Sequence, residues 1–305
     1  MRTLKLAPLA LLLITATPAN ANIDIVFDYS HNTSAFFTNN ALSKSLLDAA
    51  ASVFETRITD TLGAIDSSGR NDFELIFQNP SNASLVNIPN SDIGINEIRI
   101  YIGAENLGTS TLGQGGPGGY SASGSPAFLT SINRGQTNVT GVLATDFSPG
   151  GGSISFNSAF SSWFFDASLA TSTDIAGYDF YSVALHEISH VLGFGTAESW
   201  NDHVVGICSQ EPCSLNGKPL APGDKAHWAQ GATSTINGLG SFEVAMDPAL
   251  LNNKRKELTD QDWAGLSTIG WQVAAVPEPE TWAMLLAGLG LVGFAAGRKE
   301  KRRQS

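Results

Sequence analysis

Basic side chains are scarce in this chain of 305 residues, which holds 17 lysines and arginines against 28 aspartates and glutamates. Seven of the basic residues but only three of the acidic residues lie outside residues 22–275. Residues 22–275 therefore hold 10 basic and 25 acidic side chains and carry a net charge of −15. Such a surface repels the phosphate backbone of nucleic acids, so a nucleic-acid partner is excluded.

Cysteine is even scarcer, because Cys208 and Cys213 are the only two in the chain. A single pair cannot complete a four-cysteine zinc site, so metal binding by these thiols is only the alternative interpretation. In an exported chain the two thiols are expected to pair with each other. The sequence therefore predicts a disulfide that closes the short loop between them.

Both ends of the chain have the composition of targeting segments. Residues 1–21 begin with Arg2 and Lys5, continue with an apolar run and end in an Ala-x-Ala cleavage site, which predicts a secretory signal peptide. At the other end, residues 276–305 hold a Pro-Glu-Pro element, an apolar run and a basic tail. The apolar run is at the lower limit for crossing a bilayer, and its basic flank fits the cytoplasmic side.

This C-terminal arrangement resembles the PEP-CTERM sorting signal of exopolysaccharide-producing Gram-negative bacteria. The resemblance implies that the segment enters the inner membrane transiently and is recognised by an exosortase-type sorting enzyme. The protein would then reach the cell surface or the extracellular matrix. A plain membrane anchor is the alternative that the same hydropathy allows.

Residues 22–275 contain no long low-complexity linker and no internal repeat, so we expect one domain. Apolar periodicity predicts strands over 23–27, 73–77, 95–102 and 153–156, and a helix over 41–62. The glycine-rich segment 113–124 is expected to be an exposed loop, and 195–240 to be irregular. Thr259 and Asp262 form a capping box for a short last helix. The order of these elements predicts an α+β fold.

Residues 186–193, HEISHVLG, contain an H-E-x-x-H motif followed by a glycine. Asp179 as N-cap and Gly193 as terminator predict a helix between them. On a helix His186 and His190 share one face, so both imidazoles reach one metal ion while Glu187 stands beside them as a proton acceptor. The motif predicts a zinc hydrolase site. The alternative is an amphipathic core helix whose histidines only form hydrogen bonds.

A catalytic zinc ion needs a third protein ligand and an open position for water. Three residues beyond Gly193, where metzincin proteases place this ligand, the chain has Thr196. Two histidines remain downstream, His203 and His227. Zinc also accepts carboxylates, and the candidates of that kind are Glu198, Asp202, Glu211 and Glu243.

The order of these residues resembles that of leishmanolysin-like metallopeptidases, a branch of the metzincins. The resemblance covers residues 180–272 and rests on the motif helix, an insertion with both cysteines, then Ala226-His227-Trp228 and Met246-Asp247-Pro248. It implies that His227 is the third ligand and that Met246 forms a turn beneath the metal. It also implies a metzincin-like domain with a mixed sheet, long helices and an irregular C-terminal subdomain that ends in a helix.

The expected function is a secreted or cell-surface endopeptidase with one catalytic Zn2+ and Glu187 as general base, acting on a protein or peptide substrate. A non-catalytic matrix or adhesive protein with a structural or relic zinc site is the first alternative. The retained Glu187 disfavours it, because a structural zinc site has no use for a base. A zinc hydrolase that acts on a non-peptide substrate is the second alternative.

Overall fold

The computed structural model describes residues 22–136, 149–169, 175–209 and 213–275. The predicted signal peptide and the predicted sorting segment, with its apolar run, lie outside these residues. Within the described ranges, no helix is long and apolar enough to cross a membrane.

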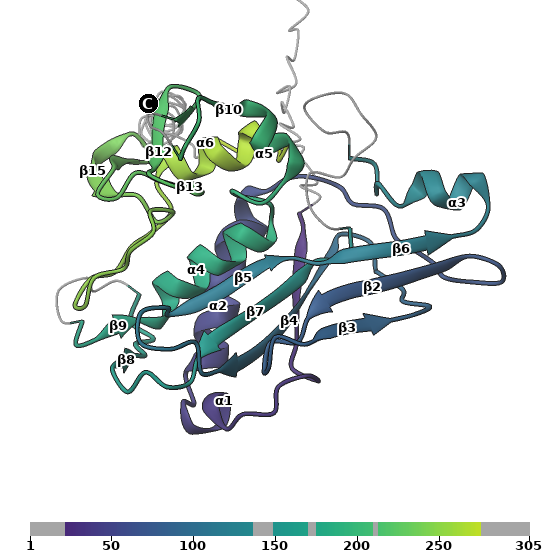
Figure 1. Ribbon diagram of the computed structural model, residues 1–305, viewed down its shortest axis with the longest axis horizontal. Coiled ribbons are helices and arrows are strands. Elements are labelled where there is room, and N and C mark those ends of the chain that lie inside the picture. Colours follow the sequence, from purple (N-terminus) through teal and green to yellow (C-terminus); the bar gives the residue numbers. More distant parts are fainter. Residues whose placement is uncertain (1–21, 137–148, 170–174, 210–212, 276–305) are drawn as a thin grey trace, which may run out of the picture.

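A four-stranded mixed sheet forms the centre of the fold, in the order β1-β4-β7-β5 (Figure 1). Its strands are β1 (Asp24–Asp28), β4 (Glu97–Glu105), β7 (Gly152–Asn157) and β5 (Gly113–Pro117). The first three run parallel, whereas β5 is antiparallel to β7 and forms an edge. Ile98, Ile100 and Ile102 of β4 are fully buried, as expected for a central parallel strand. The strands predicted over 23–27, 95–102 and 153–156 are confirmed with shifted ends.

Two helices pack against each other and against this sheet, namely α2 (Ser43–Arg57) and α4 (Phe180–Val191). The prediction that the first of them extends to residue 62 is wrong. It ends earlier because Ile58 is extended and forms a β-bridge with Val273. The predicted start of α4 is confirmed, since the Asp179 carboxylate accepts a hydrogen bond from the Ser182 N–H at 3.1 Å.

Glycine-rich residues 113–124 are not a loop, which corrects the sequence prediction. They form β5 and then β6 (Gly119–Ser123), and β6 joins a second sheet in the order β3-β2-β6. That sheet also holds β2 (Asp72–Gln78), which confirms the strand predicted at 73–77, and β3 (Leu85–Ile88). The glycines allow β5 to approach α4 closely, because a Cβ atom at Gly113 would lie only 2.9 Å from the Glu187 side chain.

The stretch 195–240 is also more regular than predicted. It contains α5 (Glu198–His203), β10 (Val204–Val205), β11 (Ser214–Leu215), β12 (Lys218–Ala221), β13 (Asp224–Trp228) and β14 (Thr233–Ile236), and β15 (Leu239–Glu243) follows. Two Asn-Gly pairs, at 216–217 and 237–238, have positive φ at both residues and connect consecutive strands. Such pairs favour tight hairpin turns, which explains why short strands form in a polar segment.

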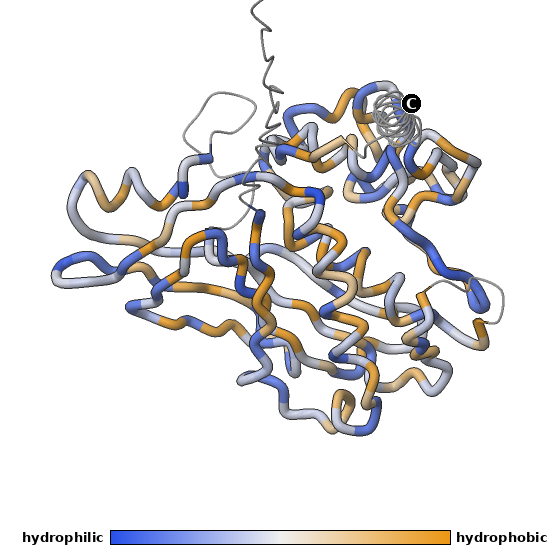
Figure 2. Tube along the Cα trace, turned by 180° about the vertical axis from the view of Figure 1, so that it is seen from behind, coloured by the Kyte–Doolittle hydropathy of each residue, from blue (hydrophilic) through white to orange (hydrophobic). Residues whose placement is uncertain are grey.

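The last helix, α6 (Asp260–Thr268), begins with the predicted capping box of Thr259 and Asp262. The predicted disulfide between Cys208 and Cys213 is also present. The remaining short elements are α1 (Phe36–Asn39), α3 (Pro126–Ser131), β8 (Trp163–Phe164) and β9 (Tyr178–Asp179). Figure 2 shows apolar stretches along the strands and helices, with hydrophilic connections between many of them. The fold is therefore mixed α and β, with several sheets and few helices.

Candidate metal centre

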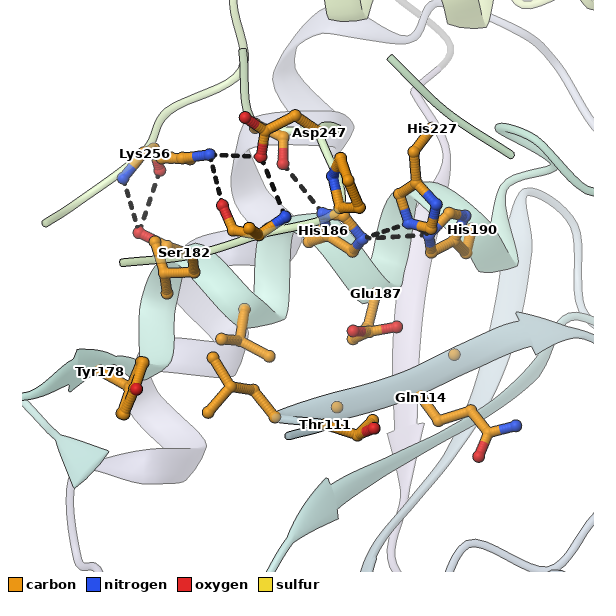
Figure 3. A pocket seen from close by; sticks show the side chains of 18 of the residues that line it. Thr111, Gln114, Tyr178, Ser182, His186, Glu187, His190, His227, Asp247 and Lys256 are labelled. Carbon is orange, nitrogen blue, oxygen red and sulfur yellow. Dashed lines mark hydrogen bonds and ion pairs between the residues drawn. The ribbon is translucent and has the colours of Figure 1, made fainter. Parts of the chain in front are cut away.

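Three histidine side chains converge at one point between α4 and β13. His186 and His190 project from successive turns of α4, and His227 reaches them from β13 (Figure 3). Their Nε2 atoms lie 3.0 to 3.1 Å from one another. The structure thus brings together residues that are up to 41 positions apart in the sequence.

The outer nitrogen of each ring faces an acceptor. Nδ1 of His186 lies 2.9 Å from the Ala245 carbonyl oxygen, and Nδ1 of His190 lies 2.8 Å from the carbonyl oxygen of Phe194. Nδ1 of His227 lies 2.6 Å from a carboxylate oxygen of Asp224. Because these oxygens only accept, each neutral ring carries its proton on Nδ1 and turns an unprotonated Nε2 inward.

Three inward lone pairs cannot form hydrogen bonds with one another, so a cation between them would stabilise the arrangement, and the group could hold a metal ion. Zinc with imidazole bonds of about 2.0–2.1 Å at tetrahedral angles separates two nitrogens by about 3.3 Å. The Nε2 triangle is close to that size. These three histidines therefore fit a zinc ion with a fourth position left for water, and outer acceptors of this kind are typical of metal-bound histidines.

The pKa values of the two rings on α4 also favour metal binding. Burial, together with the nearby His227 ring, lowers the pKa of His190 to about 4. Burial and then the two neighbouring imidazoles lower the pKa of His186 well below its usual value of 6.5. Both rings of α4 are therefore neutral at pH 7, which is the form that binds metal.

Glu187 lies beside the histidines and projects from α4 toward β5 (Figure 3). Its side chain is buried, and burial raises its pKa to about 8, while the backbone N–H of Gly115 acts in the opposite direction. Among the described residues, no lysine or arginine forms an ion pair with it. A cation bound at the histidines would favour the carboxylate form, because opposite charge lowers the pKa of an acid.

A cavity of about 520 Å3 opens over these groups. The three histidines, Glu187 and residues 113–115 of β5 all line it. Its other lining residues are mixed and include the apolar side chains of Phe160 and Leu250 and the polar or charged side chains of Ser182, Asp247 and Lys256. The cavity thus has an extended edge strand, a buried carboxylate and a candidate metal position around one space.

The other candidate ligands do not join the histidine group. His203 ends α5 and directs Nδ1 to the Ser199 carbonyl oxygen at 2.8 Å. Glu243 pairs with Lys254 and Lys256. Glu198 and Asp202 lie on α5 outside the group, and Glu211 lies outside the described residues.

Met246 is fully buried in the main core and does not line the cavity. Its neighbour Ala245 supplies the carbonyl oxygen that holds His186. The N–H groups of both residues donate to the carboxylate of Asp262, which also accepts from the indole N–H of Trp228 at 3.0 Å. One carboxylate at the start of α6 therefore holds the segments that follow His227 and support His186.

Two features of the site were missed by the sequence analysis. Gly115 was assigned to a loop, although it packs against Glu187. Asp224 was not considered, although it lies three residues before His227 and contacts its ring. The Asp-x-x-His spacing is visible in the sequence, but the contact depends on the turn between β12 and β13.

Comparisons with known proteins bear on one end of the chain. Residues 275–303 match the PEP-CTERM protein-sorting motif, which confirms the sorting signal predicted there. The motif implies recognition by an exosortase-type enzyme and export to the cell envelope or surface. Comparisons with curated proteins and with solved structures gave no match.

Proposed function

We propose that this protein is a zinc-dependent endopeptidase of the cell envelope or surface, with a leishmanolysin-like, metzincin-type catalytic domain. The observation that carries the proposal is the convergence of three histidine Nε2 atoms beside a buried carboxylate that has no cationic partner among the described residues. A buried carboxylate without a partner is costly, and a neighbouring cation offsets that cost.

His186, His190 and His227 would hold the zinc ion, which supplies Lewis-acid chemistry that lowers the pKa of water and polarises a carbonyl group. Glu187 accepts a proton from the attacking water and then delivers it to the departing amine nitrogen. The N–H of Gly115 orients this carboxylate from the side of β5. Burial beneath β5 keeps the base from moving into solvent.

Strand β5 supports a peptide as the substrate. It is an edge of the central sheet, so the backbone groups on its outer side have no strand partner within the described part of the chain. Gly113, Gln114 and Gly115 of this strand line the cavity. An extended peptide could add to this edge through main-chain hydrogen bonds, which would place one of its carbonyl groups over the histidines.

The test is to measure zinc content and casein hydrolysis by the full-length protein, with and without a peptide hydroxamate. The proposal predicts close to one zinc ion per chain and hydrolysis that the hydroxamate inhibits. Zinc without hydrolysis of casein or peptides would favour the non-catalytic alternative or a non-peptide substrate. Absence of zinc binding would overturn the proposal.

A further inference from the structure

The three histidine rings are not supported in the same way. His186 and His190 direct Nδ1 to backbone carbonyl oxygens, which neighbouring structure holds in place. His227 instead directs Nδ1 to a side chain, the carboxylate of Asp224. That carboxylate is 42% exposed, and the His227 side chain is 18% exposed, so water competes for this contact more than for the other two.

Asp224 has a local structure suited to holding a ring. Its second oxygen accepts a hydrogen bond from the Ala226 N–H at 2.9 Å, which fixes the side chain over its own strand. Gly223, with φ +74°, ends the turn from β12 and places Asp224 at the first position of β13. The carboxylate therefore meets the ring three residues farther along the same short strand.

The backbone around His227 is held by groups other than Asp224. The Trp228 N–H donates to the Met246 carbonyl oxygen at 2.9 Å, and the Lys225 carbonyl oxygen accepts from the Trp200 indole at 2.8 Å. The backbone of Ala226 also packs closely against Gly195. Removing the charge of Asp224 should thus change the orientation of the ring rather than the path of the strand.

We infer that Asp224 is a positioning residue for the metal centre: its carboxylate keeps the His227 proton on Nδ1 and presents Nε2 to the metal. This inference rests on the zinc-binding part of the proposed function and not on hydrolysis. A charged acceptor makes the ring a stronger ligand than a neutral one does, and loss of such an outer partner typically weakens metal binding about 10- to 100-fold.

The first test compares zinc dissociation constants of full-length wild type, Asp224→Asn and Asp202→Asn, measured by competition with a chromophoric chelator. Asp202→Asn is the matched control, because it removes an exposed carboxylate from α5, outside the histidine group. We expect Asp224→Asn to bind zinc about 10- to 100-fold more weakly, and Asp202→Asn to match wild type. Equal affinities of the two variants would overturn the inference while leaving zinc binding by wild type intact.

The second test separates positioning from a structural role. Nitrogen NMR of the imidazoles in metal-free protein should show the His227 proton on Nδ1 in wild type and a mixture of tautomers in Asp224→Asn. The melting temperature of the metal-free variant should match that of wild type. A wild-type ring protonated on Nε2, or weaker zinc binding explained by an equal loss of metal-free stability, would contradict the inference. If wild type binds no zinc at all, the proposed function itself fails.

Discussion

The two halves of the candidate metal centre are built differently. His186 and His190 lie one turn apart on α4, and backbone carbonyl oxygens hold both rings. His227 comes from a region of short hairpins, where a partly exposed carboxylate holds its ring. The α4 half thus depends on local helix geometry, whereas the β13 half depends on turns, a disulfide and contacts between residues far apart in the sequence.

The largest effect on zinc binding should come from removing the ligand that the β13 half supplies. His227→Ala leaves two ligands, so we expect the zinc dissociation constant to rise by more than about 100-fold. This effect exceeds the one expected when a ligand only loses its outer hydrogen-bond partner. His203→Ala is the matched control, because this ring faces the Ser199 carbonyl oxygen instead of the cluster. Zinc titration of both variants checks the expectation. The reverse order of effects would show that the hairpin region does not supply the third ligand.

A second variant tests the contact between the α4 half and β5. A Cβ atom at Gly115 would lie 2.7 Å from the Glu187 backbone oxygen and 2.9 Å from its Cβ, so Gly115→Ala should displace Glu187, the proposed base. We expect hydrolysis to fall about 100-fold, as a displacement near 1 Å can cause, with zinc content unchanged.

Gly116→Ala on the same strand is the control for this variant. A Cβ atom there meets no atom within 4 Å, so hydrolysis should stay within about twofold of wild type. Assays of peptide hydrolysis and zinc content on both variants check the prediction. Equal activity of the two would indicate that β5 does not position Glu187.

Acid should lower the stability of the metal-free protein through His190 in the α4 half. The pKa of folded His190 is about 4, below its usual value near 6.5, so the unfolded state binds more protons between these pH values. Above pH 6.5 neither state gains this proton. As the pH falls toward 4, stability should therefore decrease, by roughly 3 kcal/mol from this ring. Urea unfolding of chelator-treated wild type and His190→Gln should show a smaller acid-induced loss in the variant, and parallel curves would contradict this.

The smallest effect is expected from the disulfide of the β13 half. Carbonyl oxygens of Cys208 and Cys213 accept hydrogen bonds from Gly223 and Leu220, close to the turn that precedes Asp224. Replacing both cysteines by serine should lower the free energy of unfolding by about 2 kcal/mol, as expected for so short a loop. Zinc affinity should decrease only a few-fold. Urea unfolding under oxidising conditions tests this, and no change in stability would mean that the loop is held by other contacts.

The same division explains what could be predicted from the sequence. The motif of α4, its Asp179 cap and the capping box of α6 depend on residues a few positions apart, so spacing indicated them. The disulfide was indicated by the presence of only two cysteines in a chain expected to be exported. The edge strand at 113–117 could not be recognised in this way. Glycine is typical of loops, and only the packing of β5 against Glu187 shows why glycine is needed there.

The region of short hairpins, residues 204–243, could be predicted only in part. The Asn-Gly pairs at 216–217 and 237–238 are hairpin signals that the sequence contained, although the segment was expected to be irregular. The resemblance to a known family implied His227 as a ligand, and the structure brings this ring to the cluster. Its contact with Asp224 depends on the exact turn before β13, which spacing does not determine.

The most direct measurement of the central claim is peptide hydrolysis and zinc content of Glu187→Gln, beside Glu198→Gln as a control on α5. Because the proposed function makes Glu187 a base and not a ligand, the variant should keep its zinc and lose about 100- to 10,000-fold in hydrolysis. The control should keep both zinc and activity. A zinc-loaded Glu187→Gln protein with wild-type turnover would contradict the account.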